Sequence, residues 1–161
     1  MNRIGLFPGT FDPPSLGHLD IIQKSLISCD HLIVAVAHKP DKKSQFLFSL
    51  EEKIEMLRLI TKSNPQIEIT SFHGLTVEYA RMRKVSFLIR GLRAFSDFES
   101  EFQMAIANRK LGQIETLFLL PDERHVHISS SLIREIASFK GSLHDFVPKE
   151  IEPLIHKKLG N

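Results

Sequence analysis

Short apolar runs recur along the chain and predict β-strands. Five such runs cover residues 4–7, 31–37, 67–71, 85–89 and 116–120. Their length and their content of valine, isoleucine and phenylalanine favour strands over helices. Four of the runs are almost continuously apolar, which is typical of strands buried on both faces of a parallel sheet. The run at 67–71 instead alternates apolar and polar residues, so we predict that it lies at an edge of the sheet.

Segments with helical spacing of apolar residues lie between these runs. The segments 17–28, 96–111 and 131–139 are predicted helices, with apolar stripes formed by Leu19, Ile22, Leu26, Phe98, Phe102, Ala105, Leu132, Ile136 and Phe139. Another helix is predicted after Ser49, because Ser49 and Glu52 form a capping box ahead of a further apolar stripe. In the tail, Pro153 predicts either a kink or a late helix start.

The alternation of strands and helices predicts an α/β fold. Repeated strand–helix–strand units form right-handed crossovers, so we expect a doubly wound, Rossmann-like five-stranded parallel sheet with C-terminal helices. No repeat or linker-like change of composition divides the chain, so residues 1–161 are read as a single domain. In such sheets ligands bind beyond the carboxyl ends of the strands. Residues just after positions 7, 37, 71, 89 and 120 should therefore line one pocket.

Composition and charge exclude several classes of protein. The net charge of +2 demands neither a nucleic-acid nor a membrane partner, and Arg81, Arg83 and Lys84 are interpreted as a solvated helix end. The single cysteine, Cys29, excludes an internal disulfide and a CxxC motif. No apolar run approaches the roughly 20 residues of a membrane span or forms a signal-peptide core, so we expect a cytoplasmic protein.

The segment after the first predicted strand is suited to phosphate binding. Gly9 and Gly17 allow backbone N–H groups to approach a ligand closely, and a helix opening near Gly17 directs its positive dipole end there. His18 would donate a hydrogen bond to a phosphate oxygen; the alternative is a proline-rich loop with an incidental surface histidine. The chain contains neither GxGxxG nor GxxxxGK(S/T), so a standard NAD-binding protein is not expected.

Cationic and hydroxyl side chains follow the other predicted strands. Lys42 comes after the second strand, as either a mobile phosphate ligand or part of a solvated loop. Arg90 leaves a buried apolar strand, so its charge must meet either a ligand anion or a structural carboxylate. Gly91 separates it from Arg93. The serines at 129–131 open a predicted helix and form either an anion site or a simple N-cap.

This collection of side chains predicts phosphoryl or nucleotidyl transfer. The sequence shows no recognisable Ser-His-Asp or Cys-His set, and His125 and His127 lack an identifiable third metal ligand. Positive groups and backbone donors without a nucleophile suit catalysis by positioning and charge stabilisation. Mg²⁺ in such sites is commonly held by substrate phosphates and waters.

Two motifs at opposite ends of the chain resemble those of a known superfamily. GTFDP at 9–13 with SLGH at 15–18 resembles the N-terminal signature of the HxGH-type nucleotidyltransferases, and ISSSLIR at 128–134 resembles their ISS(T/S)xxR signature. Within that superfamily, the chain resembles the phosphopantetheine adenylyltransferases over nearly its whole length, through the segments 7–13, 40–43, 88–93 and 97–101. The resemblance implies transfer of the adenylyl group of ATP to 4′-phosphopantetheine, giving dephospho-coenzyme A and pyrophosphate. It also implies a requirement for Mg²⁺ and a cytoplasmic homohexamer.

The same resemblance implies roles for individual residues. The catalytic residues would be His18, at the ATP phosphates, Thr10, between the two substrates, and Lys42, at the phosphate of phosphopantetheine. Arg90 and Thr76 would also bind phosphopantetheine. The ATP site would be lined by Thr10, Phe11, His18, Gly91, Leu92, Arg93, Glu101, His125, Val126, His127, Ile128, Ser129, Ser130 and Ser131.

Two other functions stay open on sequence alone. Another nucleotidyltransferase of the superfamily, such as a nicotinamide mononucleotide adenylyltransferase or a cytidylyltransferase, would accept a different second substrate. A non-catalytic nucleotide sensor would use the same sheet, but it would be expected to lack His18 or the serine segment, and both are present.

Overall fold

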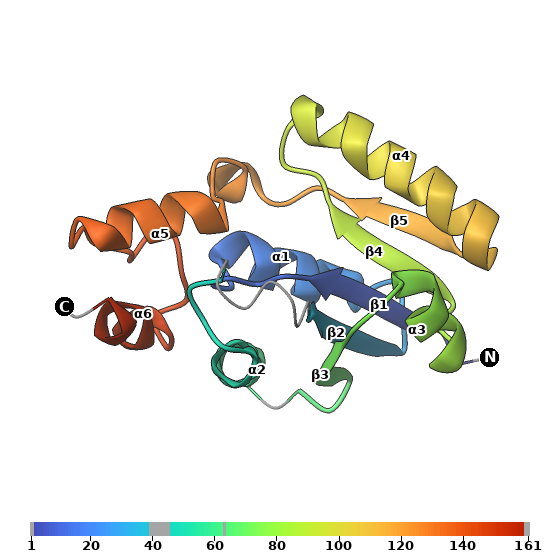
Figure 1. Cartoon of the computed structure of the whole chain (residues 1–161), viewed down its shortest axis with the longest axis horizontal. Helices are drawn as coiled ribbons and strands as arrows, with labels where there is room; N and C mark the ends of the chain where they lie inside the picture. Colours follow the sequence, from blue (N-terminus) through green and yellow to red (C-terminus); the bar gives the residue numbers. More distant parts are fainter. Residues whose placement is uncertain (1, 39–45, 63, 160–161) are drawn as a thin grey trace.

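A five-stranded parallel sheet organises the chain (Figure 1). The computed structural model describes residues 2–38, 46–62 and 64–159. The strands lie in the order β3-β2-β1-β4-β5, and every neighbouring pair is parallel. Their bounds are β1 Ile4–Gly9, β2 His31–Ala37, β3 Ile67–Phe72, β4 Phe87–Gly91 and β5 Glu115–Leu119. The predicted fold class is confirmed, and β3, the run with alternating residues, is an edge strand.

Helices cover both faces of this sheet. They are α1 (Leu16–Ser25), α2 (Leu50–Thr61), α3 (Thr76–Met82), α4 (Phe95–Gly112), the short 3-10 helix η2 (Glu123–His125), α5 (Ser130–Ser138) and α6 (Glu152–Lys158). Helices α1, α2, α5 and α6 contribute to one apolar cluster, and α3 packs in a second. Figure 1 shows α5 and α6 beyond the carboxyl ends of the strands. None of the described helices is long and apolar enough to cross a membrane.

The alternation of side chains along the central strands produces the two apolar clusters. In β1, Leu6 packs in the cluster with α3, whereas Phe7 packs in the cluster with α1 and α2. Ile33 and Val34 of β2 divide in the same way. Successive residues of a strand point to opposite faces, so a strand covered on both faces requires a continuous apolar run.

Strand β4 ends later than the sequence predicted. It runs from Phe87 to Gly91 rather than over 85–89, so Arg90 belongs to the strand and pairs in register with Phe118 of β5. The hydrogen-bonded ladder continues past the last apolar residue because it depends on backbone groups, which the apolar pattern does not report.

The apolar face of α5 differs from the predicted one. The buried residues are Ile133 and Ala137, whereas Phe139 is 82% exposed. Within the predicted stripe of Leu132, Ile136 and Phe139, Ile136 does pack against the core cluster, but the prediction is wrong for Phe139. Two neighbouring rows of apolar residues run along this helix. The row that packs most deeply is that of Ile133 and Ala137, each one position after a residue of the predicted stripe.

Helix α4 leaves its predicted stripe only partly covered. None of its residues is buried, and Phe98 and Phe102 are 41% and 48% exposed. Phe95, at the start of the helix, is 92% exposed. Ring centroids of Phe98 and Phe102 lie 5.6 Å apart, and those of Phe95 and Phe98 lie 6.2 Å apart. The helix therefore presents a continuous aromatic row that the described chain covers only in part.

The starts of two helices follow their local sequence signals. Ser49 Oγ accepts a hydrogen bond from the backbone N–H of Glu52, and Glu52 Oε2 accepts one from the N–H of Ser49, so the predicted capping box is present. Pro153 lies in the first turn of α6. Of the two expectations for the tail, the late helix start is therefore correct.

The single cysteine lies in the core beside the end of α1. Cys29 is 3% exposed, and its thiol donates a hydrogen bond to the carbonyl oxygen of Ser25 at 3.2 Å. Burial raises the pKa of the Cys29 thiol, because the thiolate would lose hydration.

Candidate active site

A cavity of about 330 Å³ opens at the carboxyl ends of β1 and β4. The loop after β1 and the starts of α1, α4 and α5 enclose it. Its lining consists of Phe7, Pro8, Gly9, Thr10, Phe11, Ser15, Gly17, His18, Ile21, Arg90, Gly91, Arg93, Asp97, Ser100, Glu101, Pro121, Ile128, Ser129, Ser130 and Ser131. This is the edge at which doubly wound sheets bind ligands. The predicted convergence of His18 and Arg90 on one pocket is confirmed, but none of the described residues just after positions 37 and 71 lines it.

His18 is held by a reciprocal capping interaction at the start of α1. Ser15 is the N-cap, and its Oγ accepts a hydrogen bond from the backbone N–H of His18 at 3.2 Å. In return, the backbone N–H of Ser15 donates to His18 Nδ1 at 3.1 Å, and Ser15 Oγ lies 3.0 Å from the same nitrogen. Because a backbone N–H only donates, Nδ1 is an acceptor and the proton of the neutral ring lies on Nε2.

The surroundings of His18 keep its ring neutral at physiological pH. Burial, together with the positive charges of Arg93 and Arg90, lowers the pKa of His18 to about 4. The ring also packs edge-on against Phe11, with centroids 5.0 Å apart. The imidazole is therefore fixed as a neutral Nε2–H donor beside two arginines.

Arg90 is paired with a carboxylate inside the cavity. Its Nε and Nη2 donate to the two carboxylate oxygens of Glu101 at 2.7 and 2.5 Å, and its Nη1 donates to the carbonyl oxygen of Pro8 at 2.7 Å. A guanidinium has five N–H donors, so these contacts leave one hydrogen on each terminal nitrogen. The ion pair that the sequence left as an alternative for Arg90 is present, and it leaves two donors for a ligand.

Arg93 connects the start of α4 to the segment before α5. Its Nε donates to Asp97 Oδ2 at 3.2 Å, and its Nη1 donates to the carbonyl oxygen of Ile128 at 3.1 Å. Asp97 therefore offsets the charge of Arg93 as Glu101 offsets that of Arg90. Since the formal charges of these four lining side chains cancel, the attraction for an anion in this part of the cavity comes mainly from oriented N–H groups and helix dipoles.

The serines at the start of α5 have different partners. Ser129 is the N-cap, because its Oγ accepts from the N–H of Leu132 at 3.1 Å. Ser130 Oγ donates to the carbonyl oxygen of Pro13 at 2.8 Å. The simple N-cap reading thus accounts for Ser129 alone. The first amides of a helix have no intrahelical acceptor, so those of Ser130 and Ser131 are suited to an anion in the cavity.

The loop after β1 contributes Thr10 and Phe11 to the lining of the cavity. Phe11 adopts a left-handed conformation with φ of 47°, and its side chain is buried at 1% exposure. Its ring packs against Phe7 and His18, and Phe11 is one of the residues that line the cavity. Thr10, beside it, is exposed and lines the cavity.

Some predicted site residues lie away from this cavity. Leu92 donates its N–H to the carbonyl oxygen of Leu119, and Thr76 begins α3. Within the segment predicted for ATP, the residues outside the cavity lining are His125, Val126 and His127. Lys42 lies outside the described residues.

The structure adds residues that the sequence reasoning missed. Asp97 and Ser100 line the cavity from the first turns of α4, and Ser15 holds His18. A helical spacing of four residues separates Asp97 from both Arg93 and Glu101, and that spacing was the available signal. On sequence alone, Ser15 is recognised only as part of a motif, and it is not predicted to cap α1. The third residue of a capping box is usually glutamate or glutamine, whereas here it is His18.

The sheet is parallel, and its carboxyl edge holds a cavity lined by a neutral histidine, two arginines and helix N-termini. These features define an α/β nucleotide-binding protein. Comparison with known proteins narrows this class. Residues 6–136 match the family model described as cytidylyltransferase-like. The chain is 45% identical over 159 residues to the phosphopantetheine adenylyltransferase of Desulforudis audaxviator, covering 98% of this chain and 96% of the relative.

Other relatives agree over similar lengths. The chain is 48% identical over 157 residues to the phosphopantetheine adenylyltransferase of Carboxydothermus hydrogenoformans, covering 97% of this chain and 96% of that protein. The identity to the corresponding protein of Clostridium botulinum is 42% over 160 residues, covering 99% and 96%. The chain belongs to the cytidylyltransferase-like family and, within it, to the phosphopantetheine adenylyltransferases.

The electrostatics of His18 predict an unusual titration. In ¹H–¹⁵N NMR spectra, the His18 ring should titrate with a midpoint near pH 4 and show the Nε2–H tautomer above it. Because an unfolded histidine binds its proton near pH 6.5, folding stability should fall as pH drops from 6.5 towards 4. H18Q should remove this part of the loss in urea unfolding at different pH values. A midpoint of His18 between pH 6 and 7 would contradict the described environment.

Proposed function

We propose that this chain transfers the adenylyl group of ATP to 4′-phosphopantetheine, with dephospho-coenzyme A and pyrophosphate as products. The observation that carries the proposal is the neutral His18 ring, held in one cavity with Arg90 and Arg93 at the carboxyl edge of the sheet. Identity of 42–48% to phosphopantetheine adenylyltransferases over nearly the whole chain supports the choice of acceptor. The single sheet, covered on both faces, supports reading residues 1–161 as one nucleotidyltransferase domain. We propose that this domain acts in the cytoplasm.

The reaction is a direct in-line displacement. An oxygen of the acceptor phosphate forms a bond to the α-phosphorus of ATP, and the bond to the bridging oxygen breaks, so that pyrophosphate leaves with the electron pair. A phosphate oxyanion is already nucleophilic, so no general base is required. His18 Nε2–H would donate to an oxygen of the reacting α-phosphate, where charge builds up as the acceptor attacks.

The remaining site residues are assigned by position. Thr10 would lie between the two substrates, while Arg90, Lys42 and Thr76 would bind phosphopantetheine. ATP would contact Thr10, Phe11, His18, Gly91, Leu92, Arg93, Glu101, His125, Val126, His127, Ile128, Ser129, Ser130 and Ser131. Cavity lining supports most of this set.

Mg²⁺ would be held mainly by the ATP phosphates. Among the residues that the structure describes, no group of three or more histidine, cysteine or acidic side chains is arranged to hold a metal ion. The two acidic side chains of the cavity, Asp97 and Glu101, are already paired with arginines. A cation carried by the substrate fits this donor set, and it would supply charge neutralisation on the triphosphate.

An assay with purified protein tests the function. ATP, Mg²⁺ and 4′-phosphopantetheine should give a product with the mass of dephospho-coenzyme A, together with pyrophosphate. Nicotinamide mononucleotide as acceptor, and CTP in place of ATP, are the controls for the related transferases. Turnover only with one of these controls, or ATP binding without turnover, would contradict the proposal.

His18 should contribute more to turnover than to ATP affinity. We expect H18A to lower kcat by about 10²–10³-fold, as removal of a donor to a developing oxyanion does, with a much smaller change in ATP affinity. Rapid-quench turnover and calorimetric ATP titration provide the two numbers. H144A, which removes an exposed histidine, is the matched control. Equal losses in turnover and affinity would instead assign His18 to ground-state binding.

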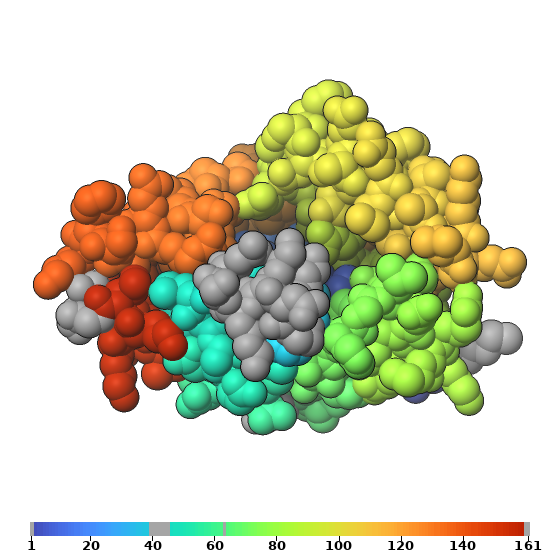
Figure 2. Space-filling view, viewed as in Figure 1, coloured from blue at the N-terminus to red at the C-terminus, as the bar shows by residue number. Residues whose placement is uncertain are grey.

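The oligomer is proposed to be a homohexamer. The aromatic row of α4 (Phe95, Phe98 and Phe102) supports self-association, because contiguous exposed apolar patches mark interaction surfaces. In Figure 2, α4 forms the upper edge of the molecule, where the described chain leaves it open.

Polar substitution of the aromatic row should therefore change the oligomer. We expect F98S/F102S to have a smaller molar mass than the wild type by light scattering after gel filtration, while far-UV circular dichroism is unchanged. I27S replaces a different residue, 84% exposed and outside this row, and should keep the wild-type mass. A wild-type mass for F98S/F102S would show that α4 is not an interface.

A further inference from the structure

We propose that Asp12 is a positioning residue, which couples the loop after β1 to the start of α2 and to α5. The Asp12 side chain is 4% exposed, and Asp12 is not among the residues that line the cavity. Any effect on the reaction must therefore pass through its neighbours. The catalytic consequence rests on the adenylyl transfer proposed above.

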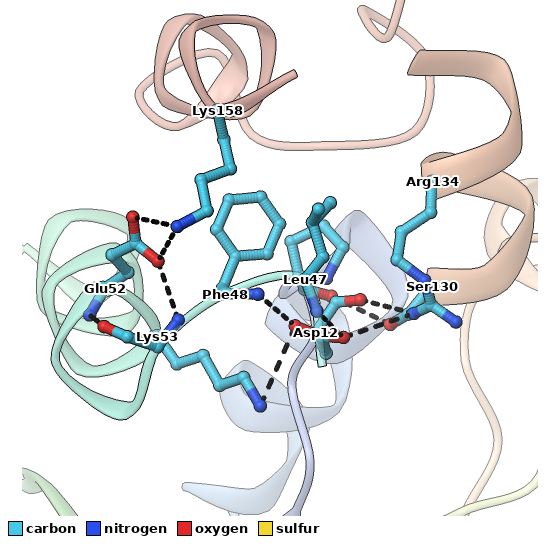
Figure 3. Close-up of polar contacts among 10 residues, drawn as sticks. Asp12, Leu47, Phe48, Glu52, Lys53, Ser130, Arg134 and Lys158 are labelled. Carbon is cyan, nitrogen blue, oxygen red and sulfur yellow. Dashed lines mark hydrogen bonds and ion pairs between the residues drawn. The ribbon is translucent and has the colours of Figure 1, made fainter. Parts of the chain in front are cut away.

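The carboxylate of Asp12 holds the backbone that leads into α2. Figure 3 shows it at the centre of a polar cluster. Oδ2 accepts from the N–H of Leu47 at 3.0 Å, and Oδ1 accepts from the N–H of Phe48 at 2.9 Å. Phe48 is 4% exposed, and a buried amide without an acceptor is costly. One side chain therefore satisfies two successive amides and fixes the approach to the N-cap of α2.

Two cations from different helices offset the buried charge. Lys53 Nζ of α2 lies 3.7 Å from Oδ1, and Arg134 Nη1 of α5 lies 3.7 Å from Oδ2. Lys53 is itself 3% exposed, and its ammonium stacks over the Phe46 ring at 3.8 Å. A buried carboxylate is tolerated when such partners surround it, so the charge of Asp12 draws α2 and α5 to the same loop.

Helix α5 also donates hydrogen bonds to the backbone of this loop. Arg134 Nη1 donates to the carbonyl oxygen of Asp12 at 2.6 Å, and Ser130 Oγ donates to that of Pro13 at 2.8 Å. The residues on either side of these contacts, Thr10 and Phe11 in the loop and Ser131 in α5, line the cavity. The distance between these two groups of cavity-lining residues is therefore set through Asp12 and Arg134.

This arrangement predicts a specific effect on the reaction. The arginines and His18 of the cavity do not bond to Asp12 in the described contacts, so binding of ATP should survive a looser loop. Alignment of the reacting phosphate is more sensitive, because a misplacement of about 1 Å can cost roughly 10²-fold in rate. Loss of Asp12 or Arg134 should thus appear in kcat rather than in the KM for ATP.

The test compares variants at the three charged positions. D12N keeps the shape but only one accepting oxygen, and R134M removes the donor to the loop. For both, we expect kcat per folded molecule to fall about 10-fold or more, with the KM for ATP within about 3-fold of wild type. R134K, whose ammonium still donates to a carbonyl, should recover part of kcat. K53M removes the buried partner that does not contact the loop backbone; it should lose thermal stability but keep kcat within about 3-fold.

A second readout does not depend on turnover. In hydrogen exchange measured by NMR, the amides of Leu47 and Phe48 should exchange faster in R134M. Both amides donate to the Asp12 carboxylate, which loses its Arg134 partner in this variant. Wild-type kcat in D12N and R134M, or an equal loss of kcat in K53M, would reduce the cluster to a purely stabilising role. If the wild-type protein transfers no adenylyl group, the proposed function is contradicted instead. In that case the exchange experiment still tests the coupling of the loop to α2 and α5, and unchanged exchange in R134M would contradict that coupling.

Discussion

The donation from the backbone N–H of Ser15 to His18 Nδ1 is the interaction on which the chemistry of the cavity depends. Because Nδ1 accepts this hydrogen bond, it does not carry the proton of the neutral ring. The proton lies on Nε2, which is therefore the donor. Burial and the two neighbouring arginines act in the same direction, because each disfavours a charged imidazole. A helix cap, usually a device for stability, here selects a tautomer.

In the rest of the site, the positive charges of the two arginines are held in fixed positions by neighbouring carboxylates. Arg90 and Arg93 are each paired with a carboxylate of α4, and the two carboxylates lie one helical turn apart. These pairs fix the positions of the guanidinium groups. The amide of Gly17 in α1 and those of Ser130 and Ser131 at the start of α5 are placed to supply the remaining attraction for phosphate. Preorganised donors of this kind do not need to reorient when charge moves during the reaction.

Most of the fold followed from the apolar pattern, and the contacts within the site did not. Near-continuous apolar runs identified the strands, and strand ends identified the edge where Thr10, His18 and Arg90 converge. Periodicity failed on α5, because adjacent apolar rows compete and only tertiary packing selects Ile133 and Ala137. Pairing was also beyond the sequence: no local pattern reveals that Arg90 meets Glu101, or that Asp12 serves residues 35 positions away.

The buried thiol of Cys29 has a consequence for the chemistry of the acceptor. Phosphopantetheine ends in a thiol, and thiols can be oxidised to disulfides. Attack on a disulfide requires an accessible thiolate, whereas the sole cysteine of this chain is shielded and its pKa is raised. The protein can therefore turn over a sulfhydryl compound without being trapped by it as a mixed disulfide.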